Sequence, residues 1–282
     1  MINLRPKIFK GFQFILVYGA LLIGLAFVLL PIVYTVSLSL RTDQEVMKVP
    51  PQLLPPHFTL TPYLHMSDFV PVFLLIRNTA FVTIGTTALA VTMAALGAYA
   101  FARLRFRFAN QLMMLLLVSQ MFPGSSLIVP LFKTLKGLGL YNQHAGLIVL
   151  YTGFTVPFCT WMLYGYFKTI PKELEDAALI DGCSRLYALA KVILPLALPG
   201  IAATAVFVML AAWNEFTFAI LFIPENSKWL ITPALTSYIG QYRSAVNYMA
   251  AAAVTGSIPL IVAFTLVRRY FISGLVAGAL KG

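Results

Sequence analysis

Six stretches of more than 20 residues lack Asp, Glu, Lys and Arg, and they constrain the fold of this chain more than any other feature. They cover residues 11–40, 78–102, 108–132, 137–167, 192–214 and 244–267. An α-helix needs about 20 apolar residues to cross roughly 30 Å of hydrocarbon. We therefore expect one transmembrane domain over 1–282, with six helices at about 12–38, 75–102, 109–131, 145–167, 193–222 and 247–268.

The expected fold class is all-α and polytopic, and the composition supports it. Hydrophobic residues make up 60% of the chain and charged residues 10%, whereas a soluble domain carries roughly 25% charged residues. This excludes a soluble enzyme, a disordered chain and a disulfide scaffold. Prolines within the expected spans, such as Pro123, Pro130 and Pro157, favour a transporter-like bundle over a simple anchor, because the carbonyls they free need partners.

The net charge of +11 is distributed by side of the membrane. Segments 1–10, 103–107, 168–191 and 268–282 hold 13 of the 20 Lys and Arg residues. Cytoplasmic segments are richer in Lys and Arg than external ones, so we expect both termini and the two loops at 103–107 and 168–191 in the cytoplasm. The charge therefore reports orientation in a membrane, and we expect no nucleic-acid partner.

The segment from 171 to 191, called the coupling segment below, has the signals of a helix–turn–helix. Pro171 suits a helix start, Gly182 suits a helix end, and Ser184 suits the cap of a second helix. Its small Ala177–Ala178 face would let another surface come close. Acids and bases balance within 168–191, which favours a protein partner over a lipid surface.

This segment resembles the EAA loop of ABC-importer inner-membrane permeases, with the pattern E-A-A-x3-G-x9-I-x-L-P. Aligned on Gly182, the sequence has Asp in place of the first Glu, with Glu175 just before it, and Val192 in place of Ile. In such permeases the loop docks on a cytoplasmic ATPase subunit. The resemblance implies that the following residues dock there: Glu175, Asp176, Ala177, Ala178, Asp181, Gly182, Ser184 and Pro195.

Further short motifs resemble one branch of these permeases, the carbohydrate-uptake permeases similar to the maltose permease. They lie at 77–79, 98–106, 213–216 and 274–282. The resemblance implies a type I importer permease of the bacterial inner membrane that carries a sugar, an oligosaccharide or a sugar derivative. It also implies a homologous second permease subunit, two cytoplasmic ABC ATPase subunits and an extracytoplasmic solute-binding protein.

Polar residues inside the expected spans are candidates for the substrate pathway. Glu215 is the one acid well inside a span, and Trp213 and Asn214 precede it. A charge at membrane depth is costly and usually faces a cavity or a partner. Glu215 could contact substrate or form a structural bond between helices, and both readings stay open. Gln120 is a second candidate.

The energy source is expected on another chain. A P-loop needs Gly-Lys before Ser or Thr, and none of the 18 glycines is followed by Lys. We expect ATP and Mg²⁺ on partner subunits, no cofactor or metal in this chain and no catalytic residue. Two alternatives remain, an ion-coupled secondary transporter and a membrane-embedded enzyme; the first tends to show internal repeats, and the second needs clustered acids or histidines.

Overall fold

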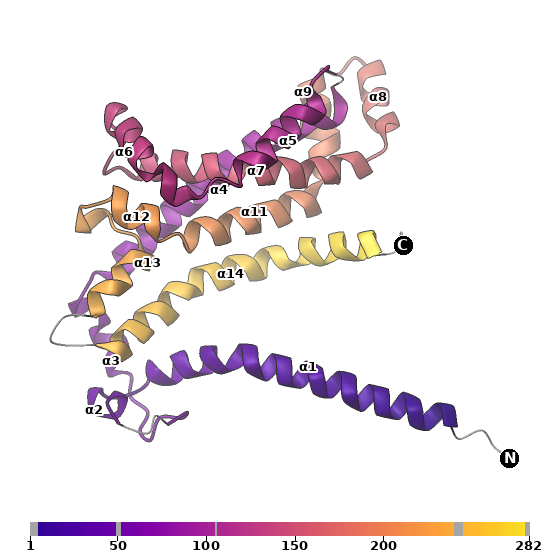
Figure 1. The fold of residues 1–282 in the computed structure, drawn as a ribbon. Coiled ribbons are helices and arrows are strands. Elements are labelled where there is room, and N and C mark those ends of the chain that lie inside the picture. The colour runs from indigo at the N-terminus through magenta and orange to yellow at the C-terminus, as the bar shows by residue number, and fades with distance from the viewer. Residues whose placement is uncertain (1–4, 49–51, 105, 240–244, 280–282) are drawn as a thin grey trace. The chain divides into compact units, whose positions relative to one another are not determined.

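The computed structural model describes residues 5–48, 52–104, 106–239 and 245–279, and the described residues are mostly helical (Figure 1). Arg105 of the basic group at 103–107 and the last three residues of the tail motif lie outside this part of the chain. The helices in order are α1 (Arg5–Leu38), α2 (Asp43–Val46), α3 (Thr61–His65), η1 (Met66–Asp68), α4 (Val72–Arg103), α5 (Ala109–Ser119), η2 (Gly124–Leu127), α6 (Ile128–Gly137), α7 (His144–Thr169), α8 (Lys172–Ile180), α9 (Arg185–Ala188), η3 (Leu189–Ile193), α10 (Leu194–Leu196), α11 (Leu198–Trp213), α12 (Thr217–Phe222), η4 (Asn226–Lys228), α13 (Ile231–Ala234), η5 (Leu235–Tyr238) and α14 (Val246–Ala279).

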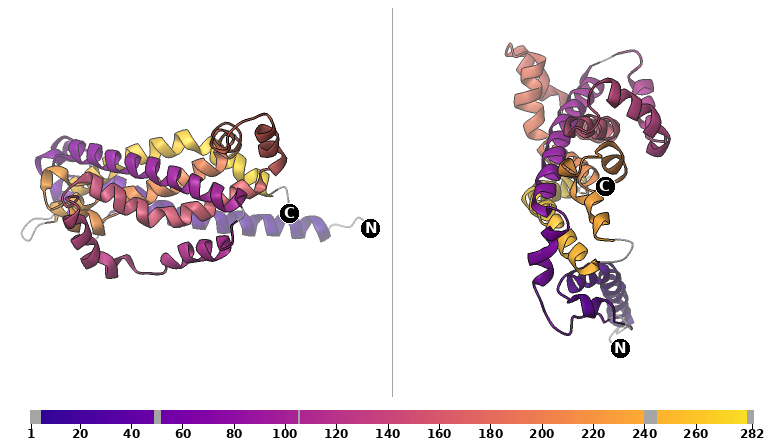
Figure 2. Two further views of the ribbon diagram at one scale, coloured as in Figure 1. Left: turned by 90° about the horizontal axis from the view of Figure 1, so that it is seen from above. Right: turned by 90° about the vertical axis from the view of Figure 1, so that its left-hand side faces the viewer.

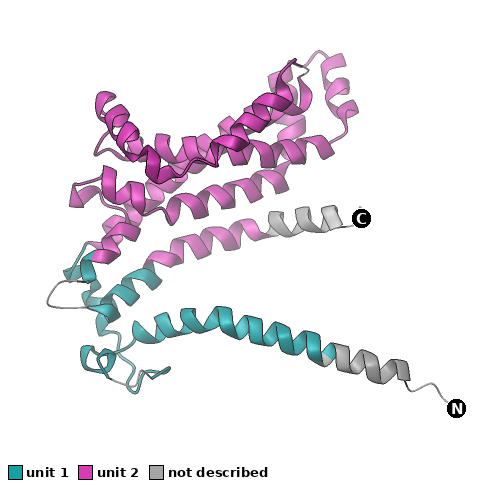
Figure 3. Ribbon diagram, viewed as in Figure 1, with its two compact units in different colours: residues 1–70, 237–255 teal, residues 71–236, 256–282 magenta. Residues whose placement is uncertain are grey.

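The chain divides into two compact units (Figure 3). The first unit consists of residues 1–70 and 237–255, and the second of residues 71–236 and 256–282. Helix α14 contributes to both. The second unit holds the coupling segment and all candidate pathway residues.

Four helices in the described part of the chain are long and apolar enough to cross a membrane. They are Leu16–Leu38 within α1, α4, α7 and Val246–Arg268 within α14. Two bent pairs of helices bring the number to six if each pair counts as one span: 109–119 with 124–137, and 185–196 with 198–213.

The spans expected at 109–131 and 193–222 are each interrupted in the structure. The first pair bends by 90° between Ser119 and Gly124, and the second by 83° at Ala197. Pro123 has no N–H and disfavours helical backbone in the residue before it, which ends the first helix. Pro199 lies in the first turn of α11, where a proline begins a helix more readily than it continues one.

Helices α4, α7 and α11 form the centre of the second unit, and Figures 1 and 2 show them running alongside one another. A glycine allows close approach between two of these helices at Gly200. A Cβ atom at this position would lie 2.4 Å from the Tyr166 ring, so only glycine lets α11 meet α7 there.

One end of the second unit joins two segments that the charge pattern assigns to the same side. Arg103 at the end of α4 donates from Nη2 to the Ile170 carbonyl after α7, at 2.8 Å. At the other end, Asn78 donates to the carbonyls of Ser227 and Trp229. The segments expected to share a side of the membrane therefore meet within this unit.

The first unit holds its own polar contacts. Arg41, 2% exposed, donates to the Ser37 hydroxyl and to the Gln52 carbonyl. Asn247 donates to the Arg41 carbonyl at 3.0 Å, which ties the start of α14 to the segment after α1.

Candidate functional site

The first helix of the coupling segment, α8, begins and ends where the sequence predicts. Pro171 precedes the helix, and Glu173 and Glu175 lie in its first turn, where carboxylates interact favourably with the helix dipole. Gly182 has φ of +87°, and a left-handed residue at this place closes a Schellman motif. Its two hydrogen bonds are present, from Gly182 N to Leu179 O and from Cys183 N to Ala178 O.

The second helix, α9, is capped by Ser184, whose side chain accepts a hydrogen bond from the Tyr187 backbone N–H. The expected helix through Lys191 is only partly regular, because a π-helical turn, η3, follows Ala188. In this turn Leu194 N donates to Leu189 O, five residues back. Leu189 and Ile193 are buried in the core of the second unit, so the coupling segment is anchored there before α11 begins.

Glu175 occupies an unexpected position. It is the one buried residue of α8, and its Oε2 lies 3.0 Å from Nε of Arg103. The hydroxyl of Tyr99 donates to its Oε1 at 2.5 Å. Glu175 was expected to dock on a partner, and in this structure its carboxylate instead faces the C-terminal end of α4, where a cation and a phenol compensate its burial.

The remaining residues expected to dock are accessible. Those exposed to solvent or half-buried are Asp176, Ala177, Ala178, Asp181, Gly182, Ser184 and Pro195. Large apolar side chains are exposed beside them: Leu174 by 44%, Leu186 by 67% and Ile180 by 86%. A surface helix normally buries its apolar side chains and exposes its charges. Helix α8 exposes Leu174 and Ile180 and buries the charged Glu175, so its outward face is suited to contact another surface.

Residues 214–216 form a break between α11 and α12, although Glu215 was expected well inside a span. Trp213 is buried and Asn214 is exposed. The Asn214 side chain donates to the Leu210 carbonyl, at the end of α11. The Glu215 carboxylate accepts from the backbone N–H groups of Phe218 and Ala219, at the start of α12. The two side chains therefore satisfy backbone groups on both sides of the break.

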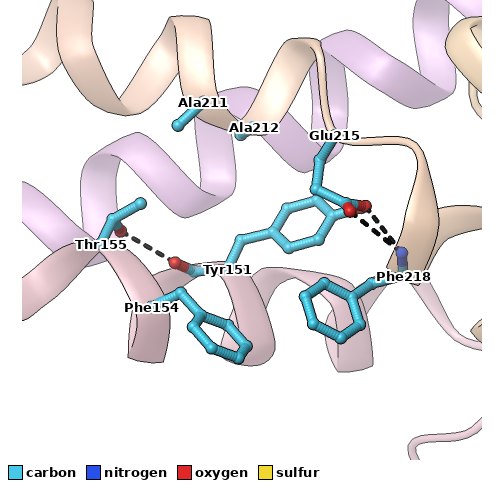
Figure 4. A pocket seen from close by; sticks show the side chains of 7 residues that line it. All are labelled: Tyr151, Phe154, Thr155, Ala211, Ala212, Glu215 and Phe218. Carbon is cyan, nitrogen blue, oxygen red and sulfur yellow. Dashed lines mark hydrogen bonds between the residues drawn. The ribbon is translucent and has the colours of Figure 1, made fainter. Parts of the chain in front are cut away.

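A small cavity of about 90 Å³ lies beside this break (Figure 4). In Figure 4 the Tyr151 ring reaches toward Glu215, and its hydroxyl donates to Glu215 Oε2 at 2.8 Å. The rings of Phe154 and Phe218 stack with centroids 5.1 Å apart. The full lining is Tyr151, Phe154, Thr155, Ala211, Ala212, Glu215 and Phe218.

Gln120 lies in the helix break at 120–123, just after α5. It is exposed, and its side chain donates to the Phe154 carbonyl at 3.0 Å. Gly124 follows this break, and a Cβ atom there would lie 3.2 Å from the Phe218 ring. The break at 120–123 and the break at 214–216 therefore both adjoin the aromatic residues that line the cavity. Of the four pathway candidates, only Glu215 lines the cavity itself.

Comparison with known families decides the identity of the chain. The family of binding-protein-dependent transport system inner membrane components matches residues 87–276, about two thirds of the sequence. The chain belongs to this family. The match includes the coupling segment, the helix breaks at 120–123 and 214–216, and the end of α4 that holds Arg103.

Relatives of the permease cover almost all of its length. It is 34% identical over 254 residues to the sulfoquinovosyl glycerol transport system permease protein SmoH of Agrobacterium fabrum, which covers 90% of this chain and 89% of the relative. It is 33% identical to the trehalose/maltose transport system permease protein MalG of Thermococcus litoralis, over 99% of this chain and all of the relative. Both relatives are permease proteins of sugar transport systems.

The fold of the permease is that of an ABC importer permease. It matches a chain in the crystal structure of a bacterial ABC transporter involved in the import of the acidic polysaccharide alginate, with a TM-score of 0.77 and 23% identity. The match covers 93% of this chain and 98% of the other. This membership sets aside a secondary transporter and a membrane-embedded enzyme, the two alternatives that the sequence left open.

Two residues of the coupling end escaped the sequence interpretation of the permease. Tyr99 and Arg103 lie four residues apart, so they share one face of α4, and both contact Glu175. The sequence marked them only as part of a family motif and as a basic anchor. The available signal was a tyrosine and an arginine on one helix face, at the end expected to meet an acidic loop.

Proposed function

We propose that this permease is one transmembrane subunit of an ATP-driven, binding-protein-dependent importer of a sugar, an oligosaccharide or a sugar derivative. It would lie in the bacterial inner membrane, with both termini and the coupling segment in the cytoplasm. The observation that carries the proposal is the outward apolar face of α8 and α9, formed by Leu174, Ile180 and Leu186, in a chain whose relatives are sugar-transport permeases.

The proposed assembly contains a homologous second permease subunit, two cytoplasmic ABC ATPase subunits and an extracytoplasmic solute-binding protein. ATP and Mg²⁺ would bind to the ATPase subunits, because this chain contains no Gly-Lys pair for a P-loop. Docking on the ATPase would cover the exposed apolar side chains of the coupling segment. Burial of apolar surface contributes about 25 cal/mol per Å², so these side chains are a natural source of affinity.

The substrate pathway is proposed to pass the helix breaks at 120–123 and 214–216. Gln120 and Asn214 are exposed there and would offer amide groups to sugar hydroxyls. Trp213 is buried, and Glu215 accepts hydrogen bonds from three donors of its own chain, so these two residues would shape the pathway. The Phe154 and Phe218 rings beside the breaks would give an apolar wall for the face of a sugar ring.

Reconstitution tests the proposal directly. The permease is placed in proteoliposomes with its partner permease and ATPase subunits, and uptake of a radiolabelled disaccharide is measured with the binding protein on the outside. We expect uptake only when ATP is inside and all partners are present. A non-hydrolysable ATP analogue serves as the matched control.

Two results would contradict the proposal. Uptake driven by an ion gradient without ATPase subunits would contradict the energy source. Binding-protein-dependent uptake of a substrate without sugar character, with no competition by sugars, would contradict the substrate class.

A further inference from the structure

Helix α8 buries a single residue, and that residue is charged. Eight of its nine residues are exposed or half-buried, and the exception, Glu175, has a side chain only 6% exposed. No apolar residue of α8 is buried: Leu174 is exposed and Leu179 is half-buried. Beyond the packing of α8 against α9 and η3, its buried contact with the rest of the second unit is therefore made by the Glu175 carboxylate.

Arg103 is the group that binds it. The Arg103 side chain is 4% exposed and pairs with Glu175 Oε2 through Nε, while its Nη2 donates to the Ile170 carbonyl. Ile170 follows the end of α7. A single guanidinium thus joins the end of α4, the end of α7 and the first turn of α8.

Tyr99 adds a third, directional contact one helical turn before Arg103. Its hydroxyl donates to the second carboxylate oxygen of Glu175, so both oxygens of Glu175 are held. Tyr99 is itself part of the core that α4 shares with α7 and α11. A displacement of Glu175 therefore acts on a helix that is packed in the centre of the unit.

We infer that Arg103, Glu175 and Tyr99 form a link that passes movement of α8 to α4. The other attachment of the coupling segment, at Leu189 and Ile193, is apolar and leads into α11. The three are positioning residues, because their side chains are buried within this chain. The inference rests on the proposed function, in which the ATPase subunits move the coupling segment.

An ion pair suits this task better than apolar packing. Apolar contacts are non-directional, whereas the charge-assisted hydrogen bond from the Tyr99 hydroxyl fixes both distance and angle at Glu175 Oε1. Arg103 holds the other oxygen as an ion pair, with its Nε 3.0 Å from Oε2. A buried carboxylate also cannot leave its cation without a large desolvation cost. Movement of α8 away from α4 is therefore opposed at one defined point.

The test compares substrate imported per ATP hydrolysed in the complete reconstituted importer. Glu175→Gln and Arg103→Gln are each expected to lower this ratio at least tenfold while the ATPase subunits still co-purify with the permease. Matched controls make the same change at exposed positions: Glu173→Gln on α8 and Arg107→Gln after α4. The controls are expected to stay within twofold of the native ratio.

The outcomes separate this inference from the proposed function. If the native complex shows no ATP-dependent uptake, the proposed function fails. If the native complex couples normally and Glu175→Gln has the same ratio as Glu173→Gln, only the link is overturned. If Glu175→Gln does not assemble, Tyr99→Phe is measured instead, because it removes one hydroxyl and keeps the ion pair; a ratio about threefold below native supports the link, and an unchanged ratio overturns it.

Discussion

Two glutamates of the second unit, Glu175 and Glu215, have different structural roles. Glu175 and Glu215 each accept a hydrogen bond from a tyrosine hydroxyl, of Tyr99 and Tyr151 respectively. Glu175 then pairs with a cation on another helix, whereas Glu215 accepts backbone N–H groups three and four residues ahead of it. The first links separate elements, and the second shapes a local break.

The difference lies in how each negative charge is compensated. Arg103 supplies a full positive charge to Glu175 from about 70 residues away in the sequence. Glu215 instead uses the free N–H groups of α12 and the partial positive charge of a helix start. We therefore expect changes around Glu175 to be costlier, and changes around Glu215 to be smaller and local.

The largest effect is expected for Arg103→Ala, which leaves the buried Glu175 carboxylate without its cation. Breaking a buried ion pair by removing one partner costs about 3–5 kcal/mol. The free energy of unfolding, measured by denaturant titration in detergent, should fall by that amount. Arg107→Ala, at an exposed position nearby, should change it by less than about 0.5 kcal/mol. Equal losses in the free energy of unfolding for the two variants would contradict the buried ion pair between Arg103 and Glu175.

A smaller effect is expected for Glu215→Ala, which removes the acceptor at the start of α12. Loss of a helix N-terminal acceptor costs about 0.5–2 kcal/mol, and the same titration measures it. Glu215→Gln keeps one side-chain oxygen as an acceptor and should cost less than the alanine variant. If Glu215→Gln lowered the free energy of unfolding as much as Arg103→Ala, Glu215 would also depend on its negative charge. The two glutamates would then not differ in how their charges are compensated.

The smallest effect is expected at a third glutamate, Glu225, in the segment after α12. Hydrogen bonds from Lys228, Ser227 and Asn142 lower the pKa of Glu225 to about 2, from an ordinary value of 4.5. A lowered pKa means that its contribution to stability is fully present above about pH 4.5 and is lost as the pH falls through about 2. Glu225→Gln should therefore leave the pH dependence of the unfolding midpoint unchanged between pH 5 and 8. A slope in that range that the variant abolishes would contradict this assignment.

Local signals in the sequence predict the coupling segment well. Pro171, Gly182 and Ser184 each act within a few residues of their own position, and each has the expected role. The role of Glu175 could not be predicted in the same way, because Arg103 and Tyr99 reach it only through the tertiary fold. An acid in the first turn of a helix looks the same in sequence whether it faces water or a buried arginine.

The helix breaks show the limit of hydropathy. Residues 193–222 are apolar enough to predict one span, but Asn214 and Glu215 favour helix ends and here bind the backbone of both flanking helices. Pro123 carried a clearer local signal for the break after α5. Apolar composition predicts which segments enter the membrane, and it does not report where the backbone inside them bends.

The most direct test of the account concerns the outward face of α8, because docking there is its central claim. Ile180 has the most exposed large apolar side chain in the described part of the chain. We predict that Ile180→Glu weakens binding of the ATPase subunits to the purified permease pair at least 30-fold, about 2 kcal/mol, the effect of a central interface residue. Leu138→Glu, a matched change at an exposed leucine after α6, should leave the affinity within twofold of native. Equal affinities for the native and Ile180→Glu permeases would contradict docking at this face.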